Sequence, residues 1–205
     1  MKSATIYTEK DVSSLKAGQT YEQCVFDTLS IKGKELQDST FTNCSFEKCN
    51  LTGTKFNNTT FSSCNFSNAD VSGCNFFSAT FTECKLLGVV LSRANSFVGV
   101  TFIRCNFDYA DMRGMDLSGM DLSKCSFFET DFSLANLEKT IFINSRVANI
   151  KLAHTMMNLT DFRGAELLGF NLHSEALKDI ILTPQQVIEL AQDIGIHVME
   201  GDNEE

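Results

Sequence analysis

Hydrophobic side chains recur at every fifth position along most of this chain. The pattern runs from Tyr21 to Leu91, shifts by one residue, and resumes from Phe97 to Leu182. All 33 of these positions are apolar or aromatic, and 15 of the 18 phenylalanines occupy them. A step of five residues rotates by about 140° around an α-helix and alternates between the two faces of a strand, so neither element could bury all these side chains. The chain must therefore turn at every repeat.

The cysteines indicate how many repeats complete one turn. Six of them are separated by 20, 20, 20, 21 and 20 residues: Cys24, Cys44, Cys64, Cys84, Cys105 and Cys125. Four five-residue units therefore make one coil, and the interval of 21 spans the shift in the hydrophobic pattern. The sequence predicts an all-β, four-sided solenoid of about eight coils over residues 21–182. We expect residues 92–96 to absorb the extra residue locally, so that the faces stay aligned.

The repeated unit resembles the pentapeptide repeat A(D/N)LXX. It is seen in Ala69-Asp70-Val71, Ala110-Asp111-Met112 and Ala135-Asn136-Leu137. This resemblance to the pentapeptide repeat protein family implies that the solenoid is a right-handed quadrilateral β-helix. The period is specific for the fold, but it does not specify a function, because one fold supports many functions.

The two ends of the chain differ from the repeats. We expect residues 1–20 to form an N-terminal cap and residues 183–205 to form a dimerisation helix and an acidic tail. Thr183-Pro184-Gln185-Gln186 predicts a helix start with a capping box, a short α-helix ending at Gly195, and then a short strand at 196–198. The helix could simply cap the solenoid. We favour a homodimer formed through its apolar residues and those that follow: Val187, Leu190, Ala191, Ile194, Ile196 and Val198.

All eight cysteines share one slot, two residues before an inward position, where alanines also occur. That slot requires a small inward side chain, and buried free cysteine acts as a small hydrophobe. Disulfides and metal binding are the alternatives, but the sequence has no CxxC pair and no Cys/His cluster at zinc spacing. We therefore expect reduced, buried thiols, no metal and no cofactor.

Candidate catalytic groups are sparse. His154, His173 and His197 are scattered, and there is no glycine-rich phosphate loop. A narrow solenoid filled by its own core leaves no substrate cavity, so we expect a non-enzyme that acts through its outer surface. No signal sequence or apolar run of about 18 residues is present, so we expect a cytoplasmic protein.

Charge is unevenly divided along the chain. Of the 26 acidic and 17 basic residues, nine of each lie in residues 1–95, so the net charge of −9 falls in the second half. This excess argues against direct nucleic-acid binding, which requires a basic surface, and indicates a basic protein partner. The alternative is that aspartate before the inward residue only stabilises turns. The candidate partner-binding residues are Asp108, Asp111, Asp116, Asp121, Glu129, Asp131, Asp161 and Glu166.

The segment LTPQQVIELAQDIGIHV, which starts at Leu182, resembles the ending of the quinolone-resistance (Qnr-type) pentapeptide proteins. Those proteins imitate DNA and act on DNA gyrase and topoisomerase IV, and their C-terminal helices pair two rods end to end. The resemblance implies a homodimeric DNA mimic that binds gyrase or topoisomerase IV and reduces fluoroquinolone susceptibility. Two alternatives remain open: a general interaction scaffold without a topoisomerase target, and a self-immunity factor against a gyrase toxin.

Overall fold

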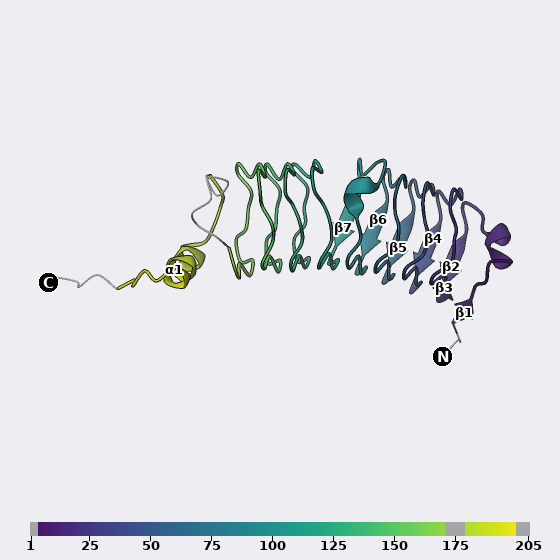
Figure 1. Ribbon diagram of the computed structural model, residues 1–205, viewed down its shortest axis with the longest axis horizontal. Helices are drawn as coiled ribbons and strands as arrows, with labels where there is room; N and C mark the ends of the chain where they lie inside the picture. Colours follow the sequence, from purple (N-terminus) through teal and green to yellow (C-terminus); the bar gives the residue numbers. More distant parts are fainter. Residues whose placement is uncertain (1–3, 171–178, 200–205) are drawn as a thin grey trace.

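The computed structural model describes residues 4–170 and 179–199, and the chain forms a rod of stacked coils (Figure 1). One side of the rod is a five-stranded parallel sheet in the order β2-β4-β5-β6-β7. Its strands are Thr20–Glu22, Thr40–Thr42, Thr60–Ser62, Thr80–Thr82 and Thr101–Ile103. Equivalent residues pair at intervals of 20, except for 21 between β6 and β7. The fold is therefore the predicted β-solenoid, with one short C-terminal helix.

Four columns of inward side chains define the four faces of the rod. We number them faces 1 to 4 after the columns that begin at Tyr21, Phe26, Ile31 and Leu36. Rings stack within a column, as Phe41 does on Phe61 with centroids 5.3 Å apart. The described inward residues are buried, except three that are only partly buried: Phe97, Leu152 and Leu182. The inward positions 172 and 177 lie outside the described residues.

Corners between faces require a left-handed backbone. The second residue after most inward residues has a positive φ, such as 67° at Gly53 and Gly73 and 64° at Leu134; Arg93 in a 3-10 helix and Pro184 in the C-terminal α-helix are exceptions. Glycine adopts this conformation without strain, whereas a residue with a Cβ is disfavoured there. The corners therefore explain why glycines recur at 20-residue intervals, at Gly33, Gly53 and Gly73. The hydrophobic pattern alone does not explain this spacing.

The cysteine slot is a hydrogen-bonding slot as well as a small one. Thr54 Oγ1 donates to the carbonyl oxygen of Ile31 in the preceding coil at 3.0 Å, and Cys74 Sγ donates to that of Leu51 at 2.9 Å. Cysteine, threonine and serine therefore exchange in this slot because each offers a short donor. The predicted burial of the cysteines is confirmed, since all eight are buried free thiols. Burial raises the pKa of Cys49, Cys74 and Cys125 to about 12.

The extra residue is accommodated in the 3-10 helix η2 (Leu91–Arg93), where the N–H groups of Leu91 and Ser92 both donate to Asp111 O. The coil that follows is not fully stacked. Within the described chain, no backbone hydrogen bond joins residues 95–104 to residues 115–124. The coils pair again on face 2, at Asn106 and Ser126. We call the interrupted part of faces 4 and 1 the seam; in Figure 1 it lies between β7 and the next coil.

Short elements close both ends of the rod. At the N-terminal end, β1 (Thr5–Ile6) pairs with β3 (Cys24–Val25), and η1 (Asp11–Ser14) follows. At the other end, α1 (Pro184–Asp193) begins at Thr183 with the predicted capping box. The segment 196–198 is irregular and exposed within the single chain, so its predicted strand stays a prediction that depends on pairing with a second copy.

Candidate partner-binding surface

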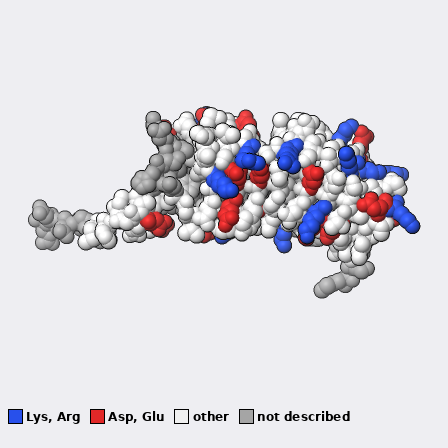
Figure 2. All heavy atoms as spheres, viewed as in Figure 1, with Lys and Arg blue, Asp and Glu red and all other residues white. Residues whose placement is uncertain are grey.

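The eight predicted acidic residues are spread around the rod. Face 1 carries Asp121 and Asp161, face 2 carries Asp108 and Glu166, face 3 carries Asp111 and Asp131, face 4 carries Asp116, and Glu129 lies at the corner after face 2. Only one pair stacks directly on neighbouring coils, since Asp111 pairs with Asp131. The fold therefore does not gather these carboxylates into one continuous surface, and Figure 2 shows acidic and basic side chains mixed on the visible face.

Five of these aspartates stabilise their own turns. Each carboxylate accepts the backbone N–H two residues later, at 2.9 to 3.1 Å, in Asp111, Asp116, Asp121, Asp131 and Asp161. Asn136 makes the same bond to the Glu138 N–H at 3.0 Å. The turn thus requires an accepting oxygen rather than a charge, so the local role of these residues is structural.

Asp108 has a different structural role because it joins two coils. Its carboxylate accepts from Ser126 Oγ at 2.6 Å and from the Phe128 N–H at 2.8 Å in the next coil. Its side chain is only 15% exposed. Asp27 makes the equivalent bond to the Glu47 N–H at 2.8 Å near the other end of the rod. A carboxylate held in this way is poorly placed to contact a partner.

Arginines neutralise part of the anionic charge. Arg113 lies 2.6 Å from Asp111 and 4.0 Å from Asp131, and Arg163 lies 2.7 Å from Asp161. Arg146 lies between two further acids, 3.7 Å from Asp108 and 3.6 Å from Glu166. The charge excess in the sequence therefore overstates the negative potential of this surface.

The same contacts shift the titration of the carboxylates. Hydrogen bonds from Arg113 lower the pKa of Asp111, and those from Arg163 lower the pKa of Asp161. The pKa of Asp116 is lowered by its bonds from Ser118. All three groups consequently remain ionised at neutral pH.

Three of the eight acids make no ion pair with any described residue: Asp116, Asp121 and Glu129. All three are exposed, although Asp116 also accepts from Asn136 Nδ2 at 3.1 Å. They lie on face 4, on face 1 and at the corner after face 2. These carboxylates are the best candidates for direct contact with a basic partner.

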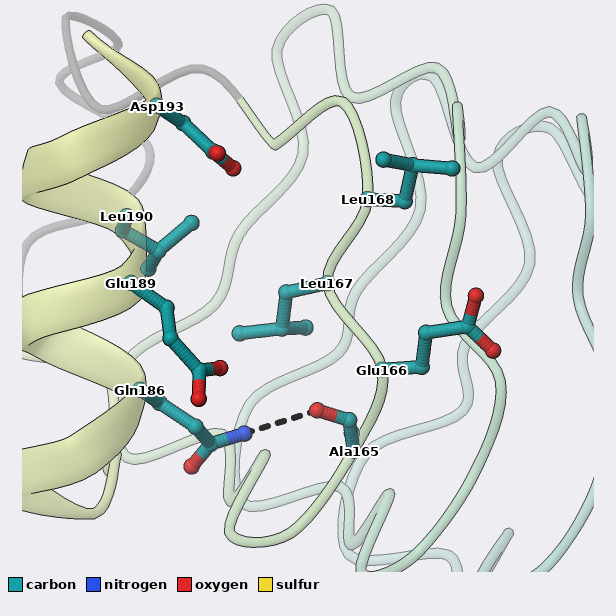
Figure 3. Close-up of a pocket in the computed structure, with 8 residues that line it drawn as sticks. All are labelled: Ala165, Glu166, Leu167, Leu168, Gln186, Glu189, Leu190 and Asp193. Carbon is teal, nitrogen blue, oxygen red and sulfur yellow. Dashed lines mark hydrogen bonds between the residues drawn. The ribbon is translucent and has the colours of Figure 1, made fainter. Parts of the chain in front are cut away.

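At the C-terminal end, Gln186 performs a task that sequence reasoning assigned only to helix capping. Its Nε2 donates at 2.8 Å to the carbonyl oxygen of Phe162 and, as Figure 3 shows, to that of Ala165. Its Oε1 accepts the Thr183 N–H at 3.0 Å. The buried amide thus replaces part of the missing coil, and its position in the capping box was the only sequence signal for it.

The apolar residues of the predicted dimer interface divide into two groups. Leu190 is 3% exposed and points toward the last coil beside Leu167, so within one chain it helps to close the rod (Figure 3). Ala191 is half-buried. The others are exposed and available to a second copy: Val187, Ile194, Ile196 and Val198. Homodimerisation remains a prediction, and the exposed group now carries it.

A cavity of about 310 Å³ lies between α1 and the last described coil. Its wall includes the carboxylates of Glu166, Glu189 and Asp193 (Figure 3). Among the described residues, no three His, Cys, Asp or Glu side chains are grouped so that they could hold a metal ion. The cavity therefore indicates no particular ligand.

No helix in residues 4–170 and 179–199 is long and apolar enough to cross a membrane.

Comparisons with known families decide the classification. The family model for the pentapeptide repeat region matches residues 19–91, and the model for pentapeptide repeats (8 copies) matches residues 96–123 and 105–144. The chain belongs to the pentapeptide repeat family. Proteins of this family are generally non-enzymatic.

Solved structures add a likeness over the whole length. Full-length QnrB1, a plasmid-mediated fluoroquinolone resistance protein, matches with a TM-score of 0.77 at 16% identity, over 94% of this chain and 95% of QnrB1. A trypsin-treated QnrB1 variant matches with a TM-score of 0.59 at 19% identity, over 98% of this chain and all of that one. A comparison with curated proteins found no match. At these identities the structures establish the shared fold.

In this pentapeptide repeat protein, we expect Asp161→Asn to keep the turn bond, as Asn136 does, and to lose the ion pair with Arg163. A lowered folded-state pKa adds stability above the unfolded value of about 3.9, and this stability disappears as pH falls through the folded value. The variant should therefore be less stable than the parent by about 1 kcal/mol at pH 7, allowing for the exposure of Arg163, and by clearly less at about pH 2, which lies further below the unfolded value. Urea unfolding at both pH values measures this, with Glu129→Gln as the unpaired control. An equal loss at both pH values would contradict the assignment.

The division of the α1 residues predicts how the dimer should respond to substitution. We expect Val187→Asp with Ile194→Asp to convert a dimer into a folded monomer, because both residues are exposed within one chain. Light scattering should show the mass falling from twice 22.8 kDa to 22.8 kDa, while Gln192→Asp on the same helix leaves it unchanged. Leu190→Asp should also lower thermal stability, since it buries a charge against the last coil. A wild-type monomer at micromolar concentration would show that α1 is only a cap.

Proposed function

We propose that the protein binds the basic DNA-binding groove of DNA gyrase or topoisomerase IV and so reduces fluoroquinolone susceptibility. The observation that carries this proposal is the likeness to QnrB1, which spans 94% of this chain and 95% of QnrB1. The tail resemblance and the acidic second half of the chain add support. A topoisomerase partner implies that the protein acts in the cytoplasm.

The rod would replace DNA electrostatically. Duplex DNA presents one negative charge for about every 1.7 Å of its axis, and the described part of the rod presents exposed, unpaired carboxylates on faces 4 and 1 and at the corner after face 2. Among the eight predicted acids, Asp116, Asp121 and Glu129 are the ones that do not pair with a described arginine. They would contact lysine and arginine side chains of the groove directly. Two rods joined through α1 would double the length of this surface.

One observation favours the alternative of a general interaction scaffold. Arg113, Arg146 and Arg163 pair with five of the eight predicted acids, so the surface is a mixture of charges rather than a uniformly anionic one. A mixed surface suits a protein partner that itself carries both signs of charge. A self-immunity role would share the topoisomerase target and differ only in the toxin that is countered.

Replacing the unpaired aspartates tests the electrostatic basis of the proposal. We expect Asp116→Asn with Asp121→Asn to retain the fold, because asparagine supplies the same turn oxygen at residue 136. Binding to purified gyrase should weaken by about fivefold to tenfold, and the wild-type complex should weaken as salt is raised. Surface plasmon resonance measures the affinity, and a supercoiling assay with ciprofloxacin measures protection.

A matched control occupies the same slot in the other half of the rod. Asp70 accepts the Ser72 N–H at 3.0 Å, as the two tested residues accept theirs, so Asp70→Asn should leave gyrase binding unchanged. If the double variant binds and protects like the parent, the DNA-mimic account loses its support. If the parent itself does not bind either topoisomerase, the scaffold alternative replaces the proposal.

A further inference from the structure

Tyr109 is an unusual residue for its position. It occupies the corner after face 2, where its backbone has a φ of 62°. Bulky side chains are disfavoured in this left-handed conformation, and among the described residues with a positive φ Tyr109 is the only tyrosine or phenylalanine. Tyr109 is also 54% exposed, so burial in the core does not offset the strain. An exposed aromatic residue in an unfavourable conformation indicates a role outside the rod.

The next coil holds the Tyr109 ring in place. The ring packs against that of Phe128 in an edge-to-face arrangement, with centroids 5.4 Å apart and 85° between the ring planes. The backbone is fixed as well, because the Tyr109 N–H donates to Phe128 O at 2.8 Å. A side chain that is already ordered loses little conformational freedom on binding. Tyr109 is therefore preorganised to contact a partner.

An unpaired carboxylate adjoins this ring. Glu129 occupies the equivalent corner of the following coil, with a φ of 53°. Neighbouring coils are about 4.8 Å apart, so Tyr109 and Glu129 are adjacent on the surface. Glu129 is exposed and makes no ion pair with any described residue, and no described lysine or arginine lies over the Tyr109 ring. The two corners thus offer an aromatic ring and a free negative charge side by side.

Arg146 shows which chemical group suits such a pair. Its Cζ lies 4.5 Å from the centroid of the Phe128 ring. The same guanidinium lies 3.7 Å from Asp108 and 3.6 Å from Glu166. The chain therefore already places one arginine on an aromatic ring between carboxylates, directly beside Tyr109. A planar, weakly hydrated guanidinium stacks on a ring more favourably than the ammonium group of lysine.

We propose that Tyr109 and Glu129 form a binding site for an arginine side chain of the partner protein. The guanidinium stacks on the Tyr109 ring and pairs with the Glu129 carboxylate. This inference rests on the proposed function for the identity of the partner, because a DNA-binding groove presents arginines that contact phosphates. It adds an aromatic anchor, a kind of residue that often dominates binding energy, and a preference for arginine over lysine.

Two basic peptides test the site without gyrase. Hexaarginine and hexalysine carry the same charge, and anisotropy titrations of the fluorescein-labelled peptides with the full chain at low salt give both affinities. We expect hexaarginine to bind more tightly. Tyr109→Leu leaves the net charge unchanged and should weaken hexaarginine binding by about twofold to fivefold, with little effect on hexalysine. The variant should fold like the parent, because Leu134 occupies another corner with a φ of 64°.

Phe77→Leu is the matched control, because Phe77 is a 45% exposed aromatic residue in the other half of the rod. It should leave both affinities unchanged. Glu129→Gln should weaken both peptides, and its effect on hexaarginine should be less than additive with that of Tyr109→Leu, since both side chains contact one cation. The proposal is overturned if Tyr109→Leu weakens both peptides equally or neither, or if the two effects on hexaarginine simply add.

Gyrase affinity separates this inference from the proposed function. A parent that binds gyrase should bind it about twofold to fivefold more weakly after Tyr109→Leu, as it does hexaarginine. If that complex is unaffected, the arginine site is refuted as a partner contact while the proposed function stands. If the peptides behave as expected but the parent does not bind gyrase, the topoisomerase partner is refuted and the arginine site stands.

Discussion

The whole architecture depends on the ladder of backbone hydrogen bonds between successive coils. This ladder requires equivalent residues to recur after 20 positions, so every five-residue unit must bury one side chain and turn a corner. The corner requires a left-handed residue, and the slot before the inward residue requires a short side chain that can donate to the coil behind it, as Thr54 and Cys74 do. The interior is therefore completely committed to packing, and the outer surface, the ends and any break in the ladder are left for function.

Each interruption of the ladder leaves backbone groups without their usual partners, and the chain treats the interruptions differently. At the C-terminal end, the Gln186 amide binds carbonyl oxygens of the last described coil, and Leu190 covers the core beside it. At the N-terminal end, β1 pairs with β3 while Val12 and Leu15 cover the first coil. At the seam, the N–H groups of Phe102 and Arg104 lack a carbonyl partner in the next coil, but the inward side chains of Phe102 and Leu122 stay buried. The seam is therefore a break in the backbone ladder and not in the hydrophobic core.

The five-residue period was sufficient to predict the solenoid, because one inward residue per repeat dominates the energetics. The cysteine spacing predicted its four sides, and the capping box predicted the terminal helix. The site was harder to predict, since sequence position does not reveal where a charged side chain finds its partner. Asp161 and Arg163 are close in sequence, but Arg146 meets Asp108 only through the stacking of coils. The seam also escaped prediction, because one extra residue at η2 changes the bonding of the following coil. The large residues Met115 and Met120 in a small-residue slot were its available signal.

The continuity of the ladder is the central claim, and residue-resolved amide hydrogen exchange tests it most directly. The N–H groups of Phe46 and Phe142, which donate to neighbouring coils at 2.7 Å, should exchange slowly. Those of Phe97, Phe102 and Arg104 should exchange much faster, although they lie near the middle of the rod. Slow exchange at all five positions would mean that the ladder is unbroken and that the seam does not exist in solution, which would contradict this account.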